Sequence, residues 1–146
     1  MTPGGARAIF AATMNQRSQP SIDFLFSMMG EAKITAMVEA FYRRIPGDPL
    51  LGPMYPAEDL LGAEERLRDF LIMRLGGPQK YLEQRGHPRL RMRHAPFSIG
   101  IAERDRWLEL MESAMDETGV EPAHAEILRP FFRQIADFMR NRREGE

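Results

Sequence analysis

Apolar side chains that recur at helical spacing, between clusters of proline and glycine, constrain the fold of this chain more than any other feature. The recurrence is found in four segments, residues 31–45, 57–75, 98–118 and 122–139. In each segment the apolar positions fall on one face of a helix. The prolines and glycines between the segments end one helix before the next begins. No segment alternates apolar and polar residues as a half-buried strand does, so the sequence predicts an all-α fold of about five or six helices.

The length of the chain is that of a single domain, at 146 residues. We expect a flexible extension at residues 1–20, the folded domain at 21–142 and a frayed tail at 143–146. Residues 1–20 contain no acidic side chain, a composition that is also typical of transit peptides.

The charge and composition exclude several classes of function. A net charge of −1 gives the chain no overall attraction to nucleic acid or to an anionic membrane. No apolar run approaches the roughly 20 residues that a membrane span needs, so we expect no membrane partner. The absence of cysteine excludes disulfides, thiolate catalysis and cysteine-ligated metals. It suits a reducing compartment, and we expect the chain to be cytoplasmic.

Residues 83–97 form a basic stretch that is interrupted by prolines and therefore cannot be one long helix. The stretch contains four arginines and two of the three histidines of the chain, His87 and His94. No pair of histidines has the short spacing of a zinc site. A single histidine can still be the protein ligand of haem iron, because the porphyrin supplies the other four nitrogens. The residues alone leave open whether His94 is such a ligand or a structural hydrogen-bonding side chain.

Three amphipathic aromatic residues are candidates for a site: Tyr42 and Trp107 lie on or beside apolar faces of the expected helices, and Tyr55 ends a short connection. A buried tyrosine or tryptophan needs a partner for its O–H or N–H group. One interpretation places all three at the edge of the core with their polar tips in water. The other has three donors converging on a small polar ligand in an apolar cavity. Spacing alone does not separate the two.

Several short runs, taken together and in order, resemble a known family over roughly residues 21–115. They are Tyr55-Pro56, the run 62–68, Gly76-Gly77-Pro78, the run 83–97, Glu103-Arg104-Asp105 and Trp107. In this order and at these distances they resemble the group II truncated haemoglobins. The resemblance implies a globin-like, truncated two-over-two helical sandwich around haem b, which is iron protoporphyrin IX.

The resemblance also implies a role for individual residues. His94 matches the proximal ligand of the haem iron. Tyr42, Tyr55 and Trp107 match the residues that donate hydrogen bonds to the distal ligand. Ala63 stands where many globins carry a distal histidine. The remaining haem contacts implied are Leu67, Phe70, Leu71, Phe97 and Met111 in the pocket, with Arg66 and Arg93 at the propionates.

The function implied is reversible binding of oxygen, with carbon monoxide and nitric oxide as further ligands. Several donors beside the ligand predict slow release, which suits chemistry or sensing better than oxygen transport. An alternative is a haem enzyme, a nitric oxide dioxygenase or one with peroxidase-like activity, served by an external reductase. Another is a helical module without haem whose basic stretch, residues 85–93, binds an acidic partner or nucleic acid; the near-neutral charge disfavours it. A homodimer is left open.

Two departures from the family pattern concern turns and packing. The family usually carries paired glycines after its first helix, where this chain has Met29-Gly30. An aromatic pair often precedes Gly76, where this chain has Arg74-Leu75. We expect the first to alter the turn and the second to alter packing on the far side of the helix.

Overall fold

The computed structural model describes residues 22–78 and 99–140, and every regular element within these ranges is a helix. The four long helices of this part of the chain are α3 (Glu31–Arg43), α4 (Leu60–Arg74), α7 (Ile101–Thr118) and α8 (Pro122–Met139). A shorter helix, α2 (Leu25–Met29), follows a 3₁₀ turn at Ile22–Phe24, and two more 3₁₀ turns lie at Gly52–Met54 and Ala57–Asp59. The prediction of an all-α fold is confirmed.

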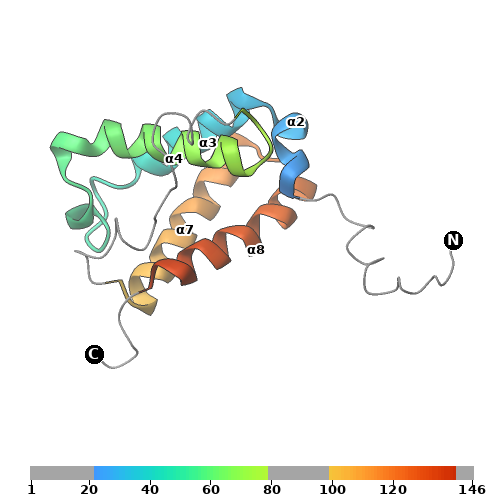
Figure 1. Ribbon diagram of the computed structural model, residues 1–146. Helices are drawn as coiled ribbons and strands as arrows, with labels where there is room; N and C mark the ends of the chain where they lie inside the picture. The colour runs from blue at the N-terminus through green and yellow to red at the C-terminus, as the bar shows by residue number, and fades with distance from the viewer. Residues whose placement is uncertain (1–21, 79–98, 141–146) are drawn as a thin grey trace, which may run out of the picture.

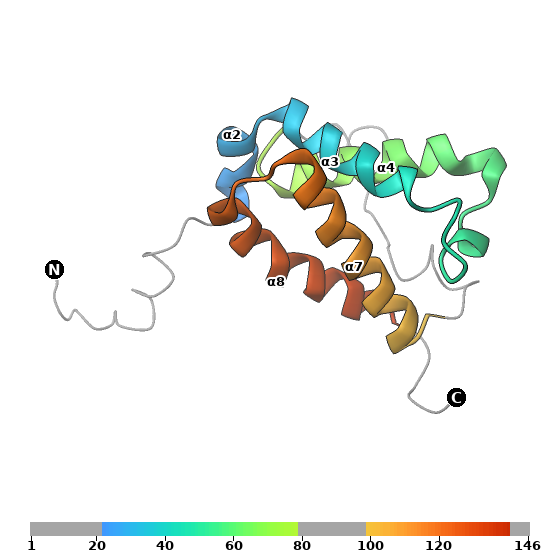
Figure 2. The ribbon, with the colours of Figure 1, turned by 180° about the vertical axis from the view of Figure 1, so that it is seen from behind.

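The long helices form two layers. Helix α3 packs against α4 and against α7, and α7 in turn packs against α8. Figure 1 shows the α3–α4 pair lying across the α7–α8 pair, and the view from behind shows the same crossing (Figure 2). This arrangement is the two-over-two architecture expected from the sequence, and it places a face of each layer toward the other.

The core lies where the layers meet, and α3 supplies much of it. Its apolar stripe is buried along the whole helix, at Ile34, Met37, Val38, Phe41 and Tyr42. Helix α8 buries a second stripe, at Leu128, Phe131, Phe132 and Ala136. The buried stripes have the period of 3.6 residues from which the helices were predicted.

The ends of the helices differ slightly from the expected ones. Helix α3 ends at Arg43, two residues before Ile45, because the proline at 46 disfavours helical backbone in the residue before it. Helix α4 is entered through the turn Ala57–Asp59. At the start of α7 the Gly100 amide donates to the Glu103 carboxylate at 2.8 Å. Ser98, the first residue of the segment expected to form this helix, lies outside the described residues, as do residues 1–20 and 143–146.

A close contact at Gly76 joins the N-terminal segment to the end of α4. Gly76 has a φ of +100°, and a Cβ atom there would lie 1.8 Å from the carbonyl oxygen of Asp23. Beside it the Phe26 amide donates to the Leu75 carbonyl at 2.8 Å. Gly76 therefore not only follows the end of the helix but also allows this close contact, which a side chain would prevent.

The two departures from the family pattern both have a structural counterpart. Gly30, with φ of +86°, joins α2 to α3: its amide donates to Phe26 and its carbonyl accepts from Ile34. The guanidinium carbon of Arg74 lies 5.3 Å from the ring centroid of Phe131 on α8. A cation over an aromatic face therefore contributes to the contact between α4 and α8. No helix in the described ranges is long and apolar enough to cross a membrane.

Candidate functional site

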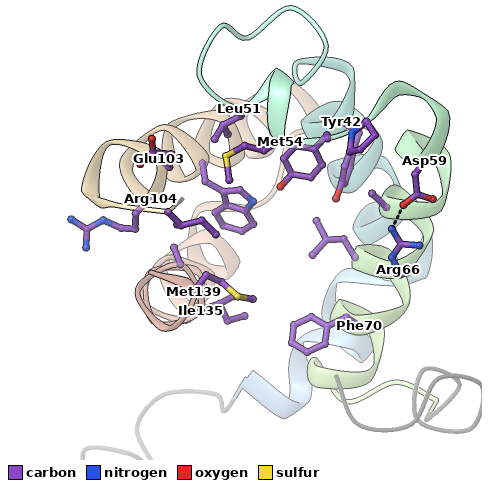
Figure 3. Close-up of a pocket in the computed structure, with 17 residues that line it drawn as sticks. Tyr42, Leu51, Met54, Asp59, Arg66, Phe70, Glu103, Arg104, Ile135 and Met139 are labelled. Atoms are coloured by element: carbon purple, nitrogen blue, oxygen red, sulfur yellow. Dashed lines mark hydrogen bonds and ion pairs between the residues drawn. The ribbon is translucent and has the colours of Figure 1, made fainter. Parts of the chain in front are cut away.

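A cavity of about 520 Å³ opens between the two layers. Its wall combines side chains from all four long helices and from the corner between α3 and α4 (Figure 3). The apolar part of the wall includes Leu67, Phe70, Ile99, Ile135, Ala136 and Met139. A concave, largely apolar cavity of this volume is typical of a small-molecule or cofactor site.

The three aromatic donors singled out in the sequence all line this cavity. Tyr42 comes from the last turn of α3, Tyr55 from the corner and Trp107 from α7. The rings of Tyr42 and Tyr55 meet edge to face, with centroids 5.7 Å apart. Phe41, the neighbour of Tyr42, packs against Trp107 with centroids 5.3 Å apart. Of the two interpretations left open by the sequence, the structure supports convergence on one cavity.

Both tyrosines are held in their neutral form. Burial raises the pKa of Tyr42 well above its usual value, and the neighbouring phenol of Tyr55 adds to the effect. Burial also raises the pKa of Tyr55, to about 12, although a hydrogen bond from the Trp107 indole N–H acts in the opposite direction. At neutral pH each phenol therefore keeps a proton that it can donate.

The corner that carries Tyr55 is anchored by a buried carboxylate, that of Asp48. Its Oδ2 accepts from the amide of Leu51 at 2.8 Å and from the amide of Leu50 at 3.2 Å. Its Oδ1 accepts from Nε of Arg106 on α7 at 2.5 Å. Burial raises the pKa of Asp48, but the amide and guanidinium donors outweigh it and hold the pKa below the usual value.

Charged side chains lie at the edges of the cavity. On the α4 side the Arg66 guanidinium pairs with Asp59 at 2.6 Å. On the α7 side stand Glu103 and Arg104, and Arg104 pairs with Asp105 and with Asp137 of α8. Figure 3 shows the Asp59–Arg66 ion pair on one side of the cavity and the side chains of Glu103 and Arg104 on the other. The apolar interior thus has a polar margin with cations on both helices.

The predicted site residues divide into three groups. Tyr42, Tyr55, Trp107, Ala63, Leu67, Phe70 and Arg66 line the cavity. Leu71 and Met111 are 0% and 1% exposed and belong to the hydrophobic core next to it, not to its described lining. His94, Arg93 and Phe97 lie outside the described residues.

Several residues of the site were missed in the sequence. Leu51 and Met54 line the cavity from the corner, whose sequence carries no periodicity. Ile135 and Met139 line it from α8, and their spacing of four by itself indicates only the apolar face of a helix. Asp48 looked like an ordinary turn residue, because its partner on α7 is distant in the sequence.

The cavity fits a flat, largely apolar cofactor with anionic groups at its edge. Its interior is apolar, its volume lies in the range of cofactor sites, and Arg66 stands at its margin. Tyr42, Tyr55 and Trp107 border the same space, and a small polar ligand beside such a cofactor needs a hydrogen-bonding partner of this kind. Among the described residues no group of three or more His, Cys, Asp or Glu side chains forms a metal site.

An all-helical, two-layered fold around a largely apolar cavity of cofactor size places the chain among the helical proteins whose layers enclose a cofactor site. The sequence profile of the bacterial-like globins matches residues 7–141. This match covers most of the chain, so the chain belongs to the bacterial-like globin family. Membership of this family implies a haem group.

Individual relatives agree with this assignment. Group 2 truncated hemoglobin YjbI of Bacillus subtilis (strain 168) is 39% identical over 121 residues, which are 83% of this chain and 91% of the relative. The crystal structure of a hemoglobin from Chloroflexus aurantiacus is 48% identical, with a TM-score of 0.75 over 85% of this chain and 100% of that chain. The group II truncated hemoglobin of Bacillus anthracis is 38% identical, with a TM-score of 0.77 over 82% and 97%. The predicted family and the globin-like fold are confirmed.

Proposed function

We propose that the chain is a haem b protein that reversibly binds oxygen and other diatomic ligands, including carbon monoxide and nitric oxide. The observation that carries the proposal is the convergence of Tyr42, Tyr55 and Trp107 on one apolar cavity. A relative from Bacillus subtilis, whose structure is 39% identical with a TM-score of 0.75, is described as an oxygen-avid truncated haemoglobin. Cytoplasmic location is a further prediction from the sequence, which leaves a homodimer open.

The residues that would hold the haem come from both layers. His94 would bind the iron, and Arg66 and Arg93 would face the propionates, as the family resemblance implies. Ala63, Leu67, Phe70, Leu71, Phe97 and Met111 would pack against the ring or support the side chains that do. Bound haem supplies an iron centre that takes a diatomic gas as its ligand.

The protein contributes hydrogen-bond donors in a defined order. An indole N–H can only donate, so the bond between Trp107 and Tyr55 has the phenol oxygen as its acceptor. The phenol proton of Tyr55 then stays available to a partner on the cavity side. Tyr42 adds a second neutral phenol, whose ring meets that of Tyr55. The small side chain of Ala63 has no polar atom that could compete for the ligand.

Each donor that reaches the ligand slows its release. A net hydrogen bond of about 1 kcal/mol corresponds to somewhat less than a tenfold change in an equilibrium or rate constant. The apolar wall excludes water that would compete for the same donors. Slow release favours chemistry with the retained gas or sensing over delivery.

The test is an absorption spectrum of the purified protein before and after reduction and addition of carbon monoxide. We expect a strong Soret band that shifts with carbon monoxide, and its loss in His94→Ala. His124→Ala, which changes the histidine in the first turn of α8, is the control and should keep the band. A protein that stays colourless after incubation with haemin would refute the proposal.

The predicted retention of oxygen also supports a second function, turnover of nitric oxide or peroxide with an external reductant. Repeated conversion of nitric oxide to nitrate by the oxygenated protein, in the presence of a reducing system, would establish it. Reaction limited to a single turnover under the same conditions would refute it.

A further inference from the structure

We propose that the Asp48–Arg106 ion pair is a positioning device that sets how Tyr55 and Trp107 meet in the cavity. The inference rests on the proposed function, because Tyr55 would face the ligand with its phenol proton while its oxygen accepts from Trp107. They come from different elements, the corner and α7, so their relative placement depends on what joins those elements.

On the side of the corner, Asp48 organises the backbone up to Tyr55. Its Oδ2 accepts from the Leu51 amide, and Leu51 itself lines the cavity. The Asp48 carbonyl accepts from the Gly52 amide at 2.8 Å, and the Gly52 carbonyl accepts from the Tyr55 amide at 3.1 Å. An unbroken series of short-range hydrogen bonds therefore connects the carboxylate to the backbone of Tyr55.

On the side of α7, Arg106 immediately precedes Trp107. Both residues lie within the 18-residue helix, whose backbone is rigid over adjacent positions. A contact that holds Arg106 against the corner therefore also holds the origin of the indole. The pair closes a ring of contacts that runs from Asp48 through Arg106 and Trp107 to Tyr55 and back along the corner.

The two partners are buried to different degrees, which makes the pair suitable for a test. The side chain of Asp48 is 1% exposed and that of Arg106 is 41% exposed. A buried carboxylate with charge-assisted partners has a well-defined geometry. The exposed arginine can instead be replaced with little loss of packing, provided that its aliphatic stem is kept.

Arg106 has a second partner that supplies the control. Its guanidinium also pairs with Glu109 at 2.9 Å, one turn further along α7 and 66% exposed. Glu109→Gln removes the ion pair of Arg106 on the solvent side and keeps its ion pair with Asp48. Any effect that depends only on the charge or solvation of Arg106 would appear in this variant too.

The experiment compares Arg106→Met, Asp48→Asn, Arg106→Lys and Glu109→Gln with the parent protein. Trp107 is the single tryptophan of the chain, so its indole N–H gives one resonance in a ¹⁵N spectrum. That resonance is recorded for each purified protein, with carbon monoxide and reductant added where haem is present. The carbon monoxide stretching band and the oxygen dissociation rate are measured on the same samples.

We expect Arg106→Met and Asp48→Asn to move the indole resonance and the stretching band, and to raise the oxygen dissociation rate about fivefold, as loss of one hydrogen bond would. Arg106→Lys should lie between Arg106→Met and the parent in all three measurements, because lysine keeps the positive charge. Glu109→Gln should match the parent. Arg106→Met is the decisive variant because Asp48→Asn changes a buried group.

A lowered melting temperature in Arg106→Met with an unchanged indole resonance would refute the inference, because the pair would then stabilise without positioning. The same holds if Glu109→Gln moves the resonance as far as Arg106→Met. Absence of a Soret band in the parent protein would refute the proposed function instead, while the indole resonance of the same protein still decides the positioning.

Discussion

Replacing Gly76 with alanine tests how closely the N-terminal segment must approach the helix that forms one wall of the cavity. The backbone at Gly76 has a φ of +100°, which costs an L-residue about 1–3 kcal/mol. The added Cβ would lie 1.8 Å from a backbone carbonyl, that of Asp23, so the segment has to move. Movement also weakens the Phe26–Leu75 hydrogen bond, worth about 1 kcal/mol.

We therefore expect Gly76→Ala to lower the free energy of unfolding by about 3 kcal/mol or more, or about 10 °C in melting temperature for a chain of this size. The measurement is thermal and urea unfolding, followed by far-ultraviolet circular dichroism at equal haem content. The strain and the contact can be separated because the chain offers two further glycines with different surroundings.

Gly119→Ala is the control for strain alone. Its φ is +71° and the nearest atom to an added Cβ, Nζ of Lys33, is 3.8 Å away, so we expect a loss of about 1 kcal/mol. Gly47→Ala is the control that involves neither backbone strain nor a close contact, since nothing lies within 4 Å of its added Cβ. It should be neutral or slightly stabilising. If Gly76→Ala costs no more than Gly119→Ala, the close contact does not determine the stability of this junction.

Two further predictions follow from the pKa shifts. Burial raises the pKa of Tyr55 to about 12 and that of Tyr42 well above its usual value, so the stability they contribute is present below about pH 10 and is lost as the pH rises toward 12. The measurement is the tyrosinate absorbance of the parent, Tyr42→Phe and Tyr55→Phe as the pH is raised. Ionisation of both phenols near pH 10 while the protein is still folded would contradict the predicted pKa shifts. The hydrogen bond from Arg129 lowers the pKa of Glu112 in the folded protein. Their ion pair therefore stabilises the fold at pH values above the pKa that Glu112 has in the unfolded chain, and this stabilisation is lost as the pH falls through the lower pKa of the folded state. Because both side chains are partly exposed, urea unfolding of Glu112→Gln should show a loss below about 1 kcal/mol at pH 7 that vanishes in acid; an equal loss at both pH values would contradict the assignment.

Much of the fold could be predicted from the sequence because a helix is indicated by the spacing of apolar residues within the helix itself. The stripe of α3 and that of α8 were predicted from spacing and are buried as expected. The ends were harder, as the two-residue difference at Ile45 shows, because helix termination depends on neighbouring backbone geometry. The contact at Gly76 was not predictable, since it joins residues 76 and 23, far apart in the chain.

The candidate site was predictable only in part, for the same reason. Tyr42, Tyr55 and Trp107 were chosen by residue type and by family resemblance, and the structure brings them to one cavity. Leu71 and Met111 were chosen in the same way but are core residues beside it. Local sequence does not specify which face of a helix meets a cavity and which meets another helix.

By itself the sequence determined that the chain is helical, where its helices lie and which family it belongs to. These properties depend on periodicity, on helix breakers and on short motifs, which act over a few residues. Only the tertiary structure decided that three aromatic side chains from three elements line one cavity and that Asp48 meets Arg106 across 58 positions. Such contacts depend on how the layers cross, because a hydrogen bond requires two groups to meet in space at a defined distance and angle.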